Sequence, residues 1–188
     1  KKVGYPEAMT IAAGFPFDGG VLLCADTQHT GAASKTHESK IFELSHEGKE
    51  KAVIALAGHV NFARAAIEAC RRQLQDAKND ESLFEVVDGT LARVYRDTVL
   101  GPYNTAEYDY RFVVATWSPD QSGVRLFVTE GTQMAPSFEY VCIGKGEDIF
   151  RCLMTTLYEG PKTTLGRLKV AAAYAMYQTK QFVPDVGG

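Results

Sequence analysis

Short apolar runs alternate with turn-forming residues along the first sixty positions, a pattern typical of β-hairpins. The runs at 10–15 and 20–25 flank a Pro-Phe-Asp-Gly turn, and those at 40–44 and 52–57 flank a Ser-His-Glu-Gly turn. The polar stretch 27–39 between the hairpins has no sustained apolar period, so it predicts a loop with at most short extended pieces.

Helical spacing begins directly after Gly58. Apolar residues recur at steps of three and four from Val60 to Leu74, and again from about Ser82 to Leu100. The Gly-Pro step after Leu100 ends the second pattern. We therefore expect two consecutive amphipathic helices.

A second block of strands and helices follows in the same order. Apolar, β-branched runs at 112–117 and 124–129 predict a hairpin, and 140–143 predicts one more strand. One helix should begin after Gly146, and another should span roughly 163–181.

Strands, two helices, strands and two helices indicate an α+β fold with two antiparallel sheets and a helical layer outside each. We predict a four-layer αββα sandwich that forms a single domain over residues 1–188, a length ordinary for one domain.

The composition excludes several functional classes. Apolar residues make up 45%, charged residues 23%, and the net charge of −3 with scattered Lys and Arg argues against a nucleic-acid partner. No apolar run approaches the ~20 residues needed to span a membrane, so we expect no membrane partner. The four cysteines form no C-x-x-C pair, which favours buried free thiols and a cytoplasmic location. The histidines lack metal-ligand spacing, so neither a metal nor another cofactor is expected.

Candidate chemistry lies at three strand ends in the first hairpins. Thr10 opens the first predicted strand, Asp26 ends the second and Lys40 opens the third. A hydroxyl, a carboxylate and an amine on adjacent strands are what an amide hydrolase with a threonine nucleophile needs. The alternative is structural: a β-favouring threonine on an edge strand, a turn-capping aspartate and a solvated lysine.

The chain resembles the proteasome-type branch of the N-terminal nucleophile hydrolases, which includes proteasome β and α subunits and the bacterial HslV peptidase. The resemblance is carried by Thr10, then DGGVLLCADTQ, the Lys in SKIFEL, IALAGH before the first helix and YVCIGKGED before the third. It implies the αββα fold, hydrolysis of peptides or unfolded proteins, a homo-oligomer and a possible ATP-dependent unfoldase partner.

The resemblance also implies roles for single residues. The Thr10 hydroxyl would be the nucleophile, and its own α-amine, with an ordinary pKa of about 7.7–8.0, the general base. Lys40 matches the active-site lysine, Asp26 matches the acid that holds it, and Gly58 matches the glycine whose N–H stabilises the oxyanion. The positions that match substrate-pocket residues are Gln28, His29, Glu38, Leu56 and Arg64.

Several positions depart from the family pattern. Residues 1–9 form a possible leader that must be removed to free the Thr10 amine, and Met9 stands where active members carry glycine. Lys145 stands where active members commonly carry a serine. Asp185 is a weak candidate for the family's second acidic residue, and closing C-terminal strands are not evident after it.

Two other functions stay open at this stage. The chain could be a non-catalytic structural or gating subunit of a proteasome-like assembly, or an N-terminal nucleophile hydrolase that acts on a small amide. A shifted alignment would place Ala8 at the nucleophile position, which would make the chain inactive.

Overall fold

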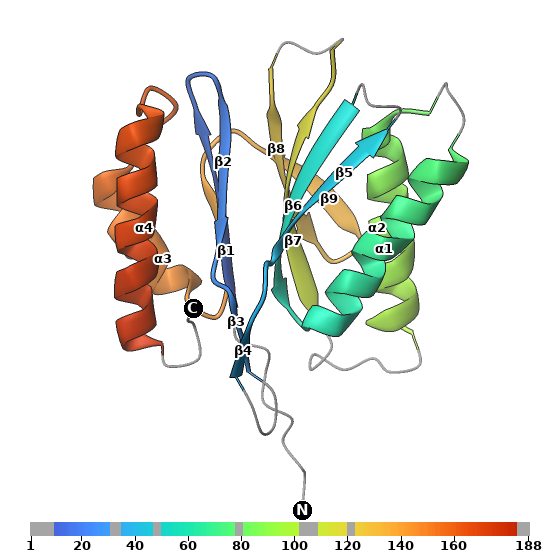
Figure 1. Ribbon diagram of the computed structural model, residues 1–188, viewed down its shortest axis with the longest axis horizontal. Coiled ribbons are helices and arrows are strands. Elements are labelled where there is room, and N and C mark those ends of the chain that lie inside the picture. The colour runs from blue at the N-terminus through green and yellow to red at the C-terminus, as the bar shows by residue number, and fades with distance from the viewer. Residues whose placement is uncertain are drawn as a thin grey trace, which may run out of the picture.

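The structure, a computed structural model, describes residues 10–30, 35–46, 50–77, 81–101, 109–119 and 123–183. These residues form four layers, with two sheets face to face and a pair of helices outside each sheet (Figure 1). The predicted αββα sandwich is therefore confirmed.

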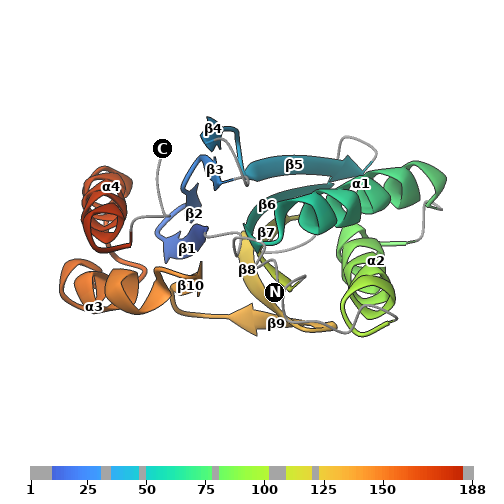
Figure 2. The same cartoon turned by 90° about the horizontal axis from the view of Figure 1, so that it is seen from below.

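The larger sheet has five antiparallel strands in the order β5-β6-β7-β8-β9. Its strands are β5 (Ile41–His46), β6 (Glu50–Gly58), β7 (Tyr110–Trp117), β8 (Arg125–Glu130) and β9 (Gln133–Ser137). The smaller sheet is also antiparallel, in the order β10-β1-β2. Its strands are β1 (Ile11–Phe17), β2 (Gly20–Ala25) and β10 (Val141–Gly144). The chain passes from β9 in one sheet to β10 in the other (Figure 2).

Two short strands, β3 (Gln28–Thr30) and β4 (Lys35–His37), form a separate antiparallel ladder between the two hairpins. This ladder lies within the stretch for which the sequence predicts a loop with short extended pieces.

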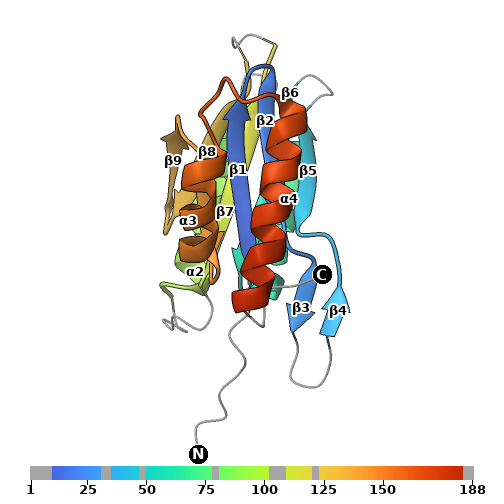
Figure 3. The same ribbon diagram turned by 90° about the vertical axis from the view of Figure 1, so that its left-hand side faces the viewer.

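Helices α1 (Val60–Asp76) and α2 (Leu83–Thr98) cover the five-stranded sheet, and α3 (Glu147–Leu157) and α4 (Leu165–Phe182) cover the three-stranded one. Figure 3 shows α3 and α4 in front of β1 and β2. A capping box stabilises the start of α2, where Ser82 and Glu85 each accept a hydrogen bond from the other's backbone N–H.

Three hydrophobic clusters occupy the three spaces between the four layers. The alternation of β1 shows how one strand serves two of them, since Ile11 and Phe15 pack with α3 and α4 while Ala12 packs between the sheets. A third cluster lies between the five-stranded sheet and the stripe of α1 that includes Ile67 and Leu74. The sandwich is thus held by apolar burial on both faces of each sheet.

Strand β9 was missed by the sequence prediction. Its sequence, QMAPS, mixes polar residues with Pro136 and gives no period-2 apolar signal. The strand lies at the edge of its sheet, where a residue without an N–H is tolerated.

The cysteines agree in part with the prediction of buried thiols. All four are free; Cys70 and Cys142 are buried, Cys24 is half-buried and Cys152 is exposed. Among the described helices, none has both the length and the apolar composition required to cross a membrane.

Candidate functional site

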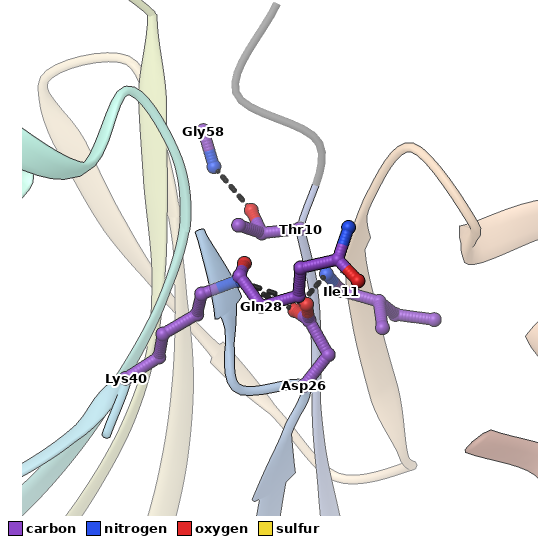
Figure 4. A network of polar contacts seen from close by, with 6 residues as sticks. All are labelled: Thr10, Ile11, Asp26, Gln28, Lys40 and Gly58. Atoms are coloured by element: carbon purple, nitrogen blue, oxygen red, sulfur yellow. Dashed lines mark hydrogen bonds and ion pairs between the residues drawn. The ribbon is translucent and has the colours of Figure 1, made fainter. Parts of the chain in front are cut away.

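Thr10 directly precedes β1, and its side chain is buried. Its Oγ1 accepts a hydrogen bond from the backbone N–H of Gly58 at 2.7 Å (Figure 4). Residues 48 positions apart in the sequence are thus brought into contact, with the hydroxyl oxygen facing the N-terminal end of α1.

Gly58 occupies a backbone position that only glycine adopts readily. Its φ is +96°, and a Cβ atom there would lie 2.5 Å from the carbonyl oxygen of Asp109. The next residue, His59, donates its backbone N–H to the same carbonyl at 2.9 Å. The strand-to-helix turn is therefore fixed against Asp109, and it presents the Gly58 N–H to Thr10.

Lys40 and Asp26 form a buried ion pair beside Thr10. The Lys40 ammonium lies 2.9 Å from both carboxylate oxygens of Asp26, and it also donates to the carbonyl oxygen of Gln28 at 2.5 Å (Figure 4). Asp26 Oδ1 accepts a further hydrogen bond from the backbone N–H of Ile11 at 3.0 Å. One carboxylate thus connects the lysine to the residue that follows Thr10.

The charge on Lys40 is subject to opposing effects. Burial lowers the pKa of its ammonium below the ordinary value of 10.5, while the charge and hydrogen bonds of Asp26 act to raise that pKa. A buried ammonium with a paired carboxylate is the arrangement that keeps a cation inside a protein.

The opposite side of Thr10 is held by the end of β10. The backbone N–H of Lys145 donates to the Thr10 carbonyl oxygen at 3.0 Å, and Gly144 pairs with Ile11 in the sheet. Gly144 has a φ of +106°, and a Cβ atom there would overlap the Thr10 carbonyl. Thr10 is therefore in contact with backbone groups from both halves of the sandwich.

The residues that were expected to form a substrate pocket lie in different environments. Glu38 and Arg64 form an ion pair near the start of α1, and Arg64 also lies 5.9 Å from the centre of the Phe42 ring. Gln28 is buried, with its carbonyl bound to Lys40. Leu56 is fully buried in the cluster against α1 and α2, so the structure does not expose it to a bound peptide.

Some predicted positions fall outside what the structure describes. The backbone of His29 lies in β3, but its side chain is not described. Ala8 and Met9 belong to residues 1–9, and Asp185 to residues 184–188, all outside the described ranges. Within those ranges, no group of three His, Cys, Asp or Glu side chains is placed to hold a metal ion.

Sequence reasoning missed three residues that support the site. Asp109 fixes the turn at Gly58, and Arg111 forms an ion pair with Glu147 at 2.7 Å. Asp109 precedes a strand and Arg111 lies within it, so neither carries a motif of its own. The contact of Asp109 arises from the pairing of β6 with β7, and that of Arg111 with Glu147 from the packing of the two halves, and no local pattern encodes either one.

Three solved structures share this fold at low sequence identity. The chain is similar to Anbu, the ancestral β-subunit, from Yersinia bercovieri, with a TM-score of 0.82 and 15% identity. It is also similar to Anbu from Hyphomicrobium sp. strain MC1, with a TM-score of 0.77 and 16% identity, and to a Pseudomonas aeruginosa Anbu complex described as a helical assembly, with a TM-score of 0.79 and 16% identity. Each alignment covers 95% of this chain and 78% of the other. No match was found among curated proteins.

A family-level comparison covers nearly the whole chain. The family described as proteasome subunit matches residues 8–183, which include Thr10, Asp26, Lys40 and Gly58. Together with the shared sandwich, this match confirms the predicted family. The chain belongs to the proteasome subunit family, as a divergent member with the N-terminal nucleophile hydrolase fold.

Proposed function

We propose that this chain is a peptidase subunit that cleaves peptide bonds with Thr10 as its nucleophile. One observation carries the proposal: the Thr10 hydroxyl lies 2.7 Å from the Gly58 N–H, and Asp26 links the next residue to the buried Lys40 ammonium. These contacts support a site in which Thr10 is the nucleophile, Gly58 the oxyanion donor and Lys40 the cation.

In the first step, the Thr10 Oγ attacks the carbonyl carbon of the substrate, and its proton passes to the Thr10 α-amine. An α-amine with a pKa of about 7.7–8.0 suits a general base near neutral pH. The Lys40 cation favours the alkoxide and the neutral amine, because a nearby positive charge lowers the pKa of both groups.

The attack moves one electron pair of the substrate C=O onto its oxygen. In the proposed reaction this oxyanion accepts a hydrogen bond from the Gly58 N–H, and the observation that supports the role is the bond from that N–H to Thr10 Oγ1. When the C–N bond breaks, the departing amine takes the proton from the Thr10 ammonium and leaves an ester on Oγ. Water, deprotonated by the amine, then attacks the ester, releases the carboxylic acid and restores the hydroxyl.

This chemistry requires that Thr10 carry a free α-amine. Met9 precedes Thr10 in the sequence, so residues 1–9 must be removed before the amine can act as a base. The proposal therefore includes a processing step between Met9 and Thr10.

We also propose that copies of the chain assemble. The supporting observations are the family, which consists of subunits, and the Pseudomonas aeruginosa neighbour described as a helical assembly. Native mass spectrometry should show multiples of the chain mass, and a monomer at micromolar concentration would contradict this part. An ATP-dependent unfoldase stays a prediction of the family resemblance.

The test is hydrolysis of fluorogenic peptides by the processed protein. We expect cleavage that is lost in Thr10→Ala and retained in Thr156→Ala, a matched change at an exposed helical threonine. A threonine-directed epoxyketone should block the wild type. Equal activity in Thr10→Ala would contradict the role of Thr10.

The two alternatives give different results in the same test. A structural or gating subunit would show no hydrolysis and no epoxyketone adduct. The structural or gating alternative is favoured by Lys145, which stands where active members commonly carry a serine. A small-amide hydrolase would form the adduct but would leave the peptides uncut.

A further inference from the structure

A second ion pair joins the two halves of the sandwich near Thr10. Arg111 in β7 donates from Nη2 to Glu147 Oε2 at 2.7 Å. Glu147 is the first residue of α3, which follows β10 in the three-stranded half. This Arg111–Glu147 pair is half-exposed, unlike the buried Lys40–Asp26 pair.

Each partner of the pair is close in the chain or the sheet to one of the two backbone N–H groups that bind Thr10. On one side, Arg111 pairs with Ala57 in the sheet, directly beside Gly58. On the other side, Glu147 follows Lys145 by two residues, and the Lys145 N–H binds the Thr10 carbonyl. The ion pair therefore joins β7, the strand paired with the Gly58 strand β6, to the start of α3, which follows the turn that contains Lys145.

Arg151 extends this contact to strand β10. Its Nη2 donates to the Cys142 carbonyl at 2.9 Å, and its Nε lies 4.0 Å from Glu147 Oε1. Within the described ranges, β10 is an edge strand that pairs with β1 alone. Glu147 and Arg151 thus hold β10, the start of α3 and β7 together.

We propose that Arg111 and Glu147 are positioning residues that set the distance between the Thr10 hydroxyl and the Gly58 N–H. This inference deepens the proposed function and depends on it for its catalytic consequence. The pair acts through the turn 145–146 between β10 and α3, because movement of that turn moves Lys145 and, with it, the backbone of Thr10.

An ion pair can contribute little to the stability of the fold and still hold a reacting group in its exact position. A half-exposed ion pair adds little to the stability of a fold. A reacting group, however, must be held within about 0.5 Å of its productive position, and a displacement of about 1 Å can cost on the order of a hundredfold in rate. We therefore expect this pair to matter for the rate far more than for folding.

The test uses Arg111→Gln, Glu147→Gln and the double variant in the processed protein. The matched control is Arg167→Gln, which breaks the exposed 2.7 Å ion pair between Arg167 on α4 and Glu159, which precedes that helix. Two quantities are measured in each variant: kcat and KM for a fluorogenic peptide, and the hydrogen-exchange rate of the Lys145 backbone amide.

We expect each single variant to lower kcat by on the order of tenfold with little change in KM. The double variant should be no worse than either single one, because all three lack the same contact. Exchange at Lys145 should accelerate by about two- to fivefold. Arg167→Gln should change neither quantity.

Two results would overturn the proposal: unchanged exchange at Lys145 in both single variants, or losses of kcat that multiply in the double variant. Exchange is measured without substrate, so it separates this proposal from the proposed function. An inactive wild type with faster Lys145 exchange in Arg111→Gln would refute the peptidase and support the positioning contact.

Discussion

Two ion pairs connect the halves of the sandwich near Thr10, and they lie in opposite environments. The side chains of Lys40 and Asp26 are 0% and 2% exposed, whereas those of Arg111 and Glu147 are 38% and 27% exposed. The buried pair also binds two backbone groups, the Gln28 carbonyl and the Ile11 N–H. The half-exposed pair has a second arginine beside it, Arg151, whose Nε lies 4.0 Å from Glu147 Oε1.

The comparison shows that two ion pairs of similar length affect stability differently when one is buried and the other is half-exposed. Removal of one buried partner leaves the other charge without water or a counterion, which lowers the free energy of unfolding strongly. Removal of one half-exposed partner lets water solvate the other. We therefore expect loss of one buried partner to destabilise the fold strongly, and loss of one half-exposed partner to affect chiefly the alignment of Thr10.

Lys40→Met should have the largest effect on stability. It leaves the Asp26 carboxylate buried and unpaired by its lysine, so the free energy of unfolding should fall by about 3–5 kcal/mol. Urea denaturation followed by circular dichroism measures this change.

The double variant Asp26→Asn/Lys40→Met sharpens that prediction. Asparagine removes the buried charge but keeps an oxygen for the Ile11 N–H, so the double variant should recover about 1–3 kcal/mol relative to Lys40→Met. If the double variant is less stable than Lys40→Met, the buried charge is not the source of the loss.

Gly144→Ala tests the contact that the half-exposed pair is proposed to hold. The added Cβ would overlap the Thr10 carbonyl at a φ of +106°, so stability should fall by about 2–4 kcal/mol, measured by urea denaturation. Gly160→Ala is the matched control, because its φ is +89° but no atom lies within 4 Å of the new Cβ. It should cost only about 1–2 kcal/mol, and equal losses would contradict the close contact with Thr10.

The pH dependence of hydrolysis tests the charge of the buried pair. Activity should rise with pH as the Thr10 amine loses its proton, with a midpoint below about 7.7 because of the nearby cation. It should fall again as Lys40 loses its proton, and this alkaline midpoint should lie below 10.5, because burial lowers the pKa of Lys40. A rate that stays level up to pH 10.5 would contradict a lowered pKa for Lys40.

Arg111→Gln should have the smallest effect on stability. Loss of a half-exposed ion pair should cost at most about 1 kcal/mol, which for a chain of this size lowers Tm by less than about 4 °C. Differential scanning fluorimetry of Arg111→Gln beside Lys40→Met makes the comparison directly. Similar losses of Tm in the two variants would contradict the expectation that the buried pair contributes more to stability than the half-exposed pair.

The sequence predicted the layers of the fold more completely than the contacts of the candidate site. Strong periods along the helices and hairpins predicted the sandwich, but the mixed sequence of β9 did not predict a strand. Thr10, Asp26 and Lys40 were indicated by their places at strand ends and by the family resemblance, and Gly58 by the resemblance alone. The structure brings Thr10 to Gly58 and Lys40 to Asp26. The contact between Arg111 and Glu147 could not be predicted, since it joins residues 36 positions apart on different layers.

The most direct test of the central claim is peptide mapping by mass spectrometry of the native protein after treatment with a threonine-directed epoxyketone. We expect a mature chain that begins at Thr10 and carries one adduct on its N-terminal peptide. A mature chain that retains residues before Thr10, or one that begins at Thr10 and carries no adduct, would contradict the claim that Thr10 and its own amine perform the reaction.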